Sequence, residues 1–157
     1  MEKIPMTALG LERLEKEFKH LKTVERPNII AAIAEARAHG DLSENAEYSA
    51  AKEKQSFIEG RIQELEAVIS RAEVIDVASI KHEHISFGAH VSLVDEESEE
   101  EITYQIVGDY EADITRGLIS TSAPISRALI GKKISQSVEV VTPKGVRFYE
   151  VLRVEYK

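Results

Sequence analysis

The sequence predicts an α+β protein, in which a helical N-terminal half is followed by a small antiparallel β-sheet domain with one short helix. Up to Asp76 the apolar residues recur at steps of three and four, as on a helix, and after Asp76 they alternate with period two, as in strands. The helical half has one short break, at Gly40 and Asp41, and so short a connection makes the two helices antiparallel neighbours. We therefore expect a coiled-coil hairpin over residues 1–76, a linker over 77–86 and the β domain over 87–157.

The first predicted helix follows Thr7, whose hydroxyl suits an N-cap. Pro27 interrupts its apolar pattern and should bend the helix or shift its register, because proline lacks the backbone N–H that a helix needs. The pattern resumes over residues 29–38 and ends before Gly40, a natural left-handed residue just past a helix end. The apolar positions on this helix are Leu11, Leu14, Phe18, Leu21, Ile29, Ile30 and Ile33.

The second predicted helix carries apolar residues at alternating steps of three and four, which is the seam of a coiled coil. With about 30 residues in each helix, the hairpin would be roughly 45 Å long. An arm this thin buries only a narrow stripe, so it is suited to reaching or to dimerising. The seam positions are Tyr48, Ala51, Gln55, Ile58, Ile62, Leu65 and Ile69.

The β domain is predicted from four stretches with strand periodicity. Pro124 and Gly131 bracket a short helix that opens at Ser122 or Ala123, and the acidic run over residues 95–101 is expected to be a solvated hairpin loop. A Pro-Lys-Gly turn precedes the last strand. The predicted strands are residues 87–94, 101–107, 137–142 and 146–156.

The composition limits the classes of function. The net charge is −8, and each half contributes about equally, whereas a protein that grips bare nucleic acid needs a basic surface for the phosphates. If a nucleic acid is involved, another molecule should hold it. The absence of Cys excludes disulfides and thiolate metal sites. No apolar run approaches the roughly 20 residues that span a bilayer, so we expect a soluble cytoplasmic protein with no membrane contact.

The predicted tip of the hairpin, residues 39–48, places Asp41 and Glu44 three residues apart. One interpretation is structural: Asp41 is an N-cap and Glu44 completes a variant of the capping box. The other is chemical, because two carboxylates on one side of a helix start could share a hard cation such as Mg²⁺. Mg²⁺ prefers octahedral oxygen coordination, so this pair would complete a metal site rather than form one alone.

Sequence segments in both halves match a family signature almost residue for residue. They are residues 4–7 (IPMT), 26–27 (RP), 29–37 (IIAAIAEAR), 39–48 (HGDLSENAEY), 108–113 (GDYEAD), 118–120 (LIS) and 124–131 (PISRALIG). By these segments the chain resembles the GreA/GreB family of bacterial transcript cleavage factors over nearly its whole length. It departs from the family pattern at Ala123, where Ser is common, and at residues 132–136 (KKISQ), where an acidic stretch is usual.

The resemblance implies an FKBP-like C-terminal domain that docks on RNA polymerase, and a hairpin that enters the polymerase secondary channel. Asp41 and Glu44 would then help polymerase carboxylates to hold a second Mg²⁺, and the RNA 3′ end of a backtracked complex would be cleaved. The chain would be a monomeric accessory factor rather than an enzyme. Two alternatives stay open: a family relative that enters the channel without promoting cleavage, and a peptidyl-prolyl isomerase activity of the FKBP-like domain.

The resemblance also implies roles for other residues at the tip. Arg37 and Lys52 would come together behind the tip as a basic spot facing the nascent RNA 3′ end, although ordinary surface charge is the alternative. Asn45 would lie near the RNA. Tyr48 starts the seam of the second helix, so core packing competes with stacking on an RNA base. The remaining tip residues, Leu42 and Ser43, would contact the channel wall.

Overall fold

A computed structural model describes residues 2–40 and 45–157 and divides the chain into two compact units. The first unit contains Leu11–Ala72 and the few residues before Ile4, and the second contains Ile4–Gly10 and Glu73–Lys157. Residues 4–10, expected in the hairpin domain, and 77–86, expected to be a linker, therefore both fall within the second unit. No helix among the described residues is both long enough and apolar enough to cross a membrane.

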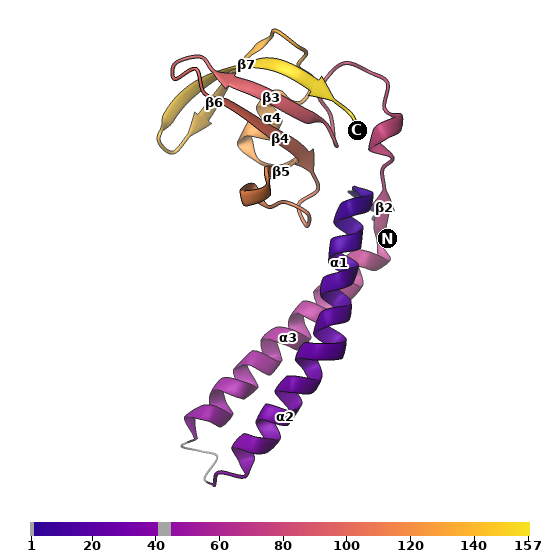
Figure 1. Ribbon diagram of the computed structural model, residues 1–157, viewed down its shortest axis with the longest axis vertical. Coiled ribbons are helices and arrows are strands. Elements are labelled where there is room, and N and C mark those ends of the chain that lie inside the picture. The colour runs from indigo at the N-terminus through magenta and orange to yellow at the C-terminus, as the bar shows by residue number, and fades with distance from the viewer. Residues whose placement is uncertain (1, 41–44) are drawn as a thin grey trace. The chain divides into compact units, whose positions relative to one another are not determined.

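The first unit is a helical hairpin. Helix α1 (Ala8–His20) leads through a π-helical turn (Leu21–Glu25) into α2 (Arg26–Arg37), and α3 (Ala46–Ser70) returns along α2. Figure 1 shows α2 and α3 side by side and antiparallel. The predicted hairpin is thus confirmed in the described residues.

The π-helical turn is the register shift that Pro27 was expected to cause. The N–H of Arg26 donates to the carbonyl of Leu21, five residues back, where an α-helix would use four. Thr23 lies four residues before Pro27, and its hydroxyl turns back to donate to the Lys19 carbonyl at 2.7 Å. The extra residue in this turn accommodates the missing donor of proline without ending the helix.

The seam between the helices is aliphatic. One cluster of buried residues within it contains Ile29, Ile33, Ala51, Ile58 and Ile62, with Phe18, Leu21 and Tyr48 packed partly against them.

Two seam predictions were wrong. Val68, not Ile69, is buried after Leu65, and the side chain of Ile30 is exposed. Positions three and four residues after Leu65 both lie on its side of the helix, so the spacing alone does not choose between them.

Two bidentate ion pairs tie the helices together outside the seam. Arg26 on α2 donates to both carboxylate oxygens of Glu59 on α3, each at 2.8 Å. Arg61 on α3 does the same with Glu17 on α1, at 2.7 and 2.9 Å. The hydrogen bonds from Arg26 lower the pKa of the Glu59 carboxyl below its ordinary value.

The second unit is built on a five-stranded sheet with the order β5-β4-β3-β7-β6. The strands are β3 (His90–Asp95), β4 (Glu101–Val107), β5 (Leu118–Ser120), β6 (Ser137–Thr142) and β7 (Gly145–Glu155). The four predicted strands are confirmed and pair antiparallel, whereas β5 was missed and pairs parallel with β4. A three-residue strand is too short for period-two alternation to reveal it.

Short elements complete the second unit. β1 (Ile4–Met6) pairs with β2 (Ala72–Val74), and one-turn 3-10 helices lie at Val77–Ser79 and Ile114–Arg116. Helix α4 (Pro124–Leu129) is the predicted short helix, and Figure 1 shows it against one face of the sheet. The core on that face contains Ile85, Ala89, Val91, Leu93, Ile106, Ile119, Leu129, Val138, Val140 and Val151.

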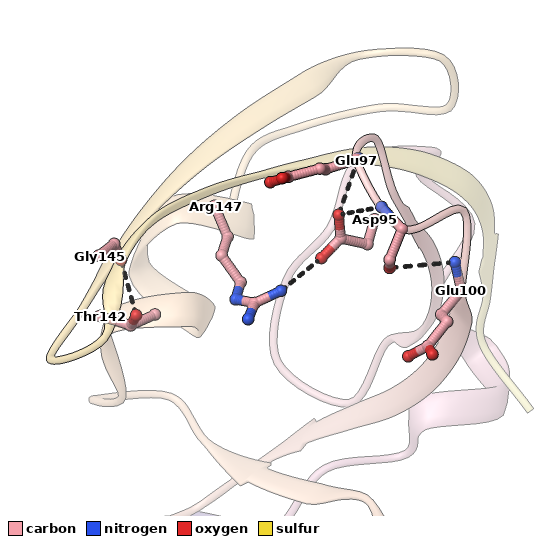
Figure 2. A network of polar contacts seen from close by, with 7 residues as sticks. Asp95, Glu97, Glu100, Thr142, Gly145 and Arg147 are labelled. Carbon is pink, nitrogen blue, oxygen red and sulfur yellow. Dashed lines mark hydrogen bonds and ion pairs between the residues drawn. The ribbon is translucent and has the colours of Figure 1, made fainter.

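The acidic loop after β3 is not entirely solvated. Asp95, at 6% exposure, accepts the N–H groups of Glu97 and Ser98 at 2.9 and 3.1 Å, and Arg147 of β7 at 3.0 Å. Figure 2 shows this network with the neighbouring turn at Thr142 and Gly145. These bonds, led by the two backbone N–H groups, lower the pKa of Asp95. Asp95 therefore fixes the loop, while the acidic residues that follow remain exposed.

Candidate functional site at the hairpin tip

The two helices of the hairpin meet the tip at well-defined ends. Helix α2 ends at Arg37, and Gly40 adopts a positive φ of 113°, as expected for a glycine past a helix end. Helix α3 begins at Ala46. Four predicted site residues, Asp41, Leu42, Ser43 and Glu44, lie outside the described residues.

Asn45 is the N-cap of α3 and joins the two helices at the tip. Its side-chain oxygen accepts the N–H of Tyr48 at 3.0 Å, and its side-chain amide donates to the carbonyl of Ala36 at 2.7 Å. One side chain thus satisfies an orphan donor at the start of α3 and adds a second donor to a carbonyl near the end of α2, which also accepts the N–H of His39 at 3.2 Å. Sequence reasoning assigned Asn45 only to RNA contact, although Asn is among the best N-cap residues.

This cap corrects the structural interpretation of the acidic pair. Asp41 was one candidate for the N-cap of the second helix, but α3 begins five residues later and is capped by Asn45. The start of α3 therefore needs no carboxylate at position 41 or 44.

Tyr48 packs in the seam, as one of its two predicted roles required. It is half-buried against the aliphatic cluster of the hairpin. The guanidinium carbon of Arg37 lies 6.0 Å from the centroid of its ring, at the outer limit of a cation–π contact. The ring therefore links the seam to one of the two predicted cations, and its stacking on RNA stays a prediction.

Arg37 and Lys52 line the same hollow on the hairpin, as predicted from their positions in an antiparallel pair. The hollow has a volume of about 230 Å³, and its other lining residues are Ile30, Ile33, Ala34 and Gln55. The Lys52 ammonium donates to the Gln55 side-chain oxygen at 3.3 Å. Within residues 2–40 and 45–157, neither cation forms an ion pair with a carboxylate.

The donor groups at the tip limit what kind of metal site is possible. Among the described residues, no cluster of three or more His, Asp or Glu side chains could hold a metal ion. Asp41 and Glu44 offer carboxylate oxygens, the ligands that Mg²⁺ prefers, but two side chains fill only part of its coordination shell. An ion bound by this pair would need its remaining ligands from another molecule or from water.

Comparison with known proteins covers the whole chain. A family model described as "Transcription elongation factor, N-terminal" matches residues 4–74, and one described as "Transcription elongation factor, GreA/GreB, C-term" matches residues 80–156. Transcription elongation factor GreA of Caulobacter sp. (strain K31) is 62% identical over 156 residues, covering 99% of each chain. The protein of the same name from Rickettsia conorii is 62% identical over 155 residues, covering 99% of this chain and 96% of its own.

Two solved structures are also similar in sequence. The GreA factor homolog 1 (Gfh1) protein of Thermus thermophilus is 28% identical, with a TM-score of 0.46, and covers 98% of this chain and 99% of its own. The GreA/GreB factor of Nitrosomonas europaea is 26% identical, with a TM-score of 0.44, and covers 98% and 100%. From the two family models and the whole-length relatives, the chain belongs to the GreA/GreB family of transcription elongation factors.

Proposed function

We propose that this chain binds RNA polymerase, inserts its hairpin into the secondary channel and stimulates the polymerase's own Mg²⁺-dependent cleavage of the RNA 3′ end in backtracked complexes. The observation that carries the proposal is the acidic pair Asp41 and Glu44 between the ends of two antiparallel helices, in a chain 62% identical to GreA proteins over its full length. The chain then acts as an accessory factor in the cytoplasm, as a monomer. The family relative that only blocks the channel has no need of such a pair.

The acidic pair supplies part of a metal site, and the polymerase supplies the rest. Asp41 and Glu44 bind Mg²⁺ together with polymerase carboxylates, and neither is needed to cap α3. When bound, the ion lowers the pKa of a coordinated water and stabilises charge on the phosphate oxygens. The role of the protein is to bring two anionic ligands to an ion that gives up its waters reluctantly.

The described residues behind the pair support contact with an RNA backbone. Arg37 and Lys52 lie around one hollow without carboxylate partners in the described ranges, and such cations attract phosphate. Tyr48 and Asn45 belong to the same helix start, and Leu42 and Ser43 contact the channel wall. With a net charge of −8, the chain needs the polymerase to hold the nucleic acid.

The decisive test is Asp41→Asn in a cleavage assay on stalled, backtracked elongation complexes. Loss of one anionic ligand weakens recruitment of Mg²⁺, so RNA cleavage should fall by about 100-fold or more, the scale on which a transition-state contact acts. Binding to polymerase and thermal stability should match the unmodified chain, and raised Mg²⁺ should partly restore the rate. The chain without polymerase should cleave no RNA.

The matched control is Asp76→Asn, the same chemical change at an exposed carboxylate whose side chain makes no cap hydrogen bond. It should cleave at the unmodified rate. Full activity of Asp41→Asn would refute the metal role. An unmodified chain that binds polymerase and slows synthesis without cleavage would establish the blocking alternative instead.

A further inference from the structure

The second unit contains an almost buried carboxylate, which hydrogen bonds hold in place. Glu111, at 9% exposure, accepts three hydrogen bonds: the N–H of Thr7 at 2.9 Å, the hydroxyl of Thr7 at 2.5 Å, and the N–H of Gly108 at 2.9 Å. Among the described residues, no Lys, Arg or His forms an ion pair with it. Burying a carboxylate without a cation is costly unless hydrogen bonds replace the lost water. Here the three donors do so.

These hydrogen bonds stabilise the first turn of α1. Thr7 is its N-cap, as predicted, because its hydroxyl oxygen accepts the N–H of Gly10 at 3.0 Å. The same hydroxyl donates its proton to Glu111, so the cap is itself held by a carboxylate 104 residues away in sequence. A negative charge at a helix N-terminus is also favoured by the helix dipole.

Two glycines make this approach possible. A Cβ atom on Gly10 would stand 1.9 Å from an oxygen of Glu111, and one on Gly108 would stand 2.7 Å from the carbonyl oxygen of Pro5. Neither distance is sterically allowed, so a Cβ atom at position 10 would displace the Glu111 carboxylate and one at position 108 would displace the Pro5 backbone. The segment Ile4–Gly10 is therefore held against the loop that carries Glu111. This segment, Gly108 and Glu111 all lie within the second unit.

We propose that Glu111 is a positioning residue for the activity at the hairpin tip, a role that rests on the function proposed above. Helix α1 runs without a break from Ala8 to His20 and so passes from the second unit into the first. Whatever holds its first turn restrains the hairpin that follows. Glu111 thereby couples the hairpin to the unit expected to dock on the polymerase, and makes delivery of Asp41 and Glu44 efficient.

The test uses two variants that weaken the clamp and two that leave it intact. In Glu111→Gln one carboxylate oxygen becomes an amide NH₂ group, which is a donor. It would then face an N–H or O–H donor of Thr7 or Gly108 instead of accepting a hydrogen bond from it. Thr7→Val replaces the hydroxyl with a methyl group at nearly constant volume, which removes its bond to Glu111 and the cap on the Gly10 N–H. Thr7→Ser keeps the hydroxyl, and Glu101→Gln makes the same chemical change at an exposed glutamate.

Spin labels can report the coupling directly, because the chain has no cysteine of its own. Labels at Lys54→Cys in the first unit and Glu139→Cys in the second, both exposed, give a distance distribution by pulsed electron resonance. Glu111→Gln and Thr7→Val should broaden that distribution, and the two controls should keep its width. Circular dichroism shows whether each variant is folded. If Glu111→Gln does not fold, Thr7→Val still tests the proposal.

The same variants are then compared in the cleavage assay over a range of factor concentrations. The weakened clamp should lower the maximal cleavage rate about tenfold, the factor that corresponds to a lost hydrogen bond to a charged group. The concentration giving half the maximal rate should stay the same. Unchanged widths in both clamp variants, or broadened widths with full maximal rates, would overturn the positioning role. If the unmodified chain stimulates no cleavage, the proposed function fails, and the label distances alone decide whether Glu111 couples the units.

Discussion

Replacing Asn45 with Ala should destabilise the hairpin at its tip, and by an amount that the two hydrogen bonds of this residue define. Loss of the cap on α3, now made to the N–H of Tyr48 at 3.0 Å, costs about 1 kcal/mol. Loss of the bond to the Ala36 carbonyl at 2.7 Å costs about 1 kcal/mol more, the net value of one hydrogen bond, and leaves that carbonyl with the N–H of His39 as its donor. Asn45→Ala should therefore lower the free energy of unfolding by roughly 2 kcal/mol.

A second variant separates the two contributions. Asn45→Asp keeps the capping oxygen, and Asp caps a helix about as well as Asn. It replaces the donor to Ala36 with an oxygen, however, so the loss should be at least the share of that one bond, about 1 kcal/mol. Urea unfolding followed by helical circular dichroism measures both variants against the unmodified chain. If Asn45→Ala unfolds at the same urea concentration as the unmodified chain, Asn45 does not hold the tip as described here.

Three further predictions concern stability and its dependence on pH. Ile62→Ala at the 4% exposed seam position should cost about 3 kcal/mol in urea unfolding, while Ile69→Ala should cost clearly less; equal losses would mean the seam is misplaced. Because the folded pKa of Glu59 is lowered by Arg26, its contribution is present above the ordinary glutamate pKa and is lost as pH falls through the lowered value. The melting temperature of Glu59→Gln should therefore fall less at acid pH than that of the unmodified chain. The same pH dependence of the melting temperature in both chains would refute this contribution of the ion pair. Ser126 is fully buried and its hydroxyl has no hydrogen-bond partner among the described residues, so Ser126→Ala should melt at the same temperature or higher; a lower melting temperature would show that the hydroxyl is satisfied in solution.

The local order of the hairpin followed from residue spacing because its interactions are close in sequence. Steps of three and four identify a buried helical stripe. Pro27 predicted a bend or register shift in the first helix, and the structure has a π-helical turn there. Spacing could not say which of two adjacent positions ends the seam. Val68 was found there instead of Ile69, because that choice depends on how the two helices wind around each other.

The cap of α3 shows a different limit. Asp41 and Asn45 are both good N-cap residues, and each lies before an apolar helical pattern. The bond from Asn45 to the Ala36 carbonyl is made across the hairpin, so only the antiparallel partner decides between the two. Arg37 and Lys52 were placed together correctly because an antiparallel hairpin brings residues on either side of its turn to the same level.

By itself, the sequence determined the helical hairpin, the four longer strands and the family, since periodicity and a dense local motif are properties of nearby residues. Tertiary structure alone decided that β5 joins β4 in parallel and that Asp95 pairs with Arg147. It alone placed residues 4–10 with the second unit, under the carboxylate of Glu111. These contacts join positions 13 to 104 residues apart. The pairing of such distant groups is set by which surfaces pack together, and no local pattern of residues records it.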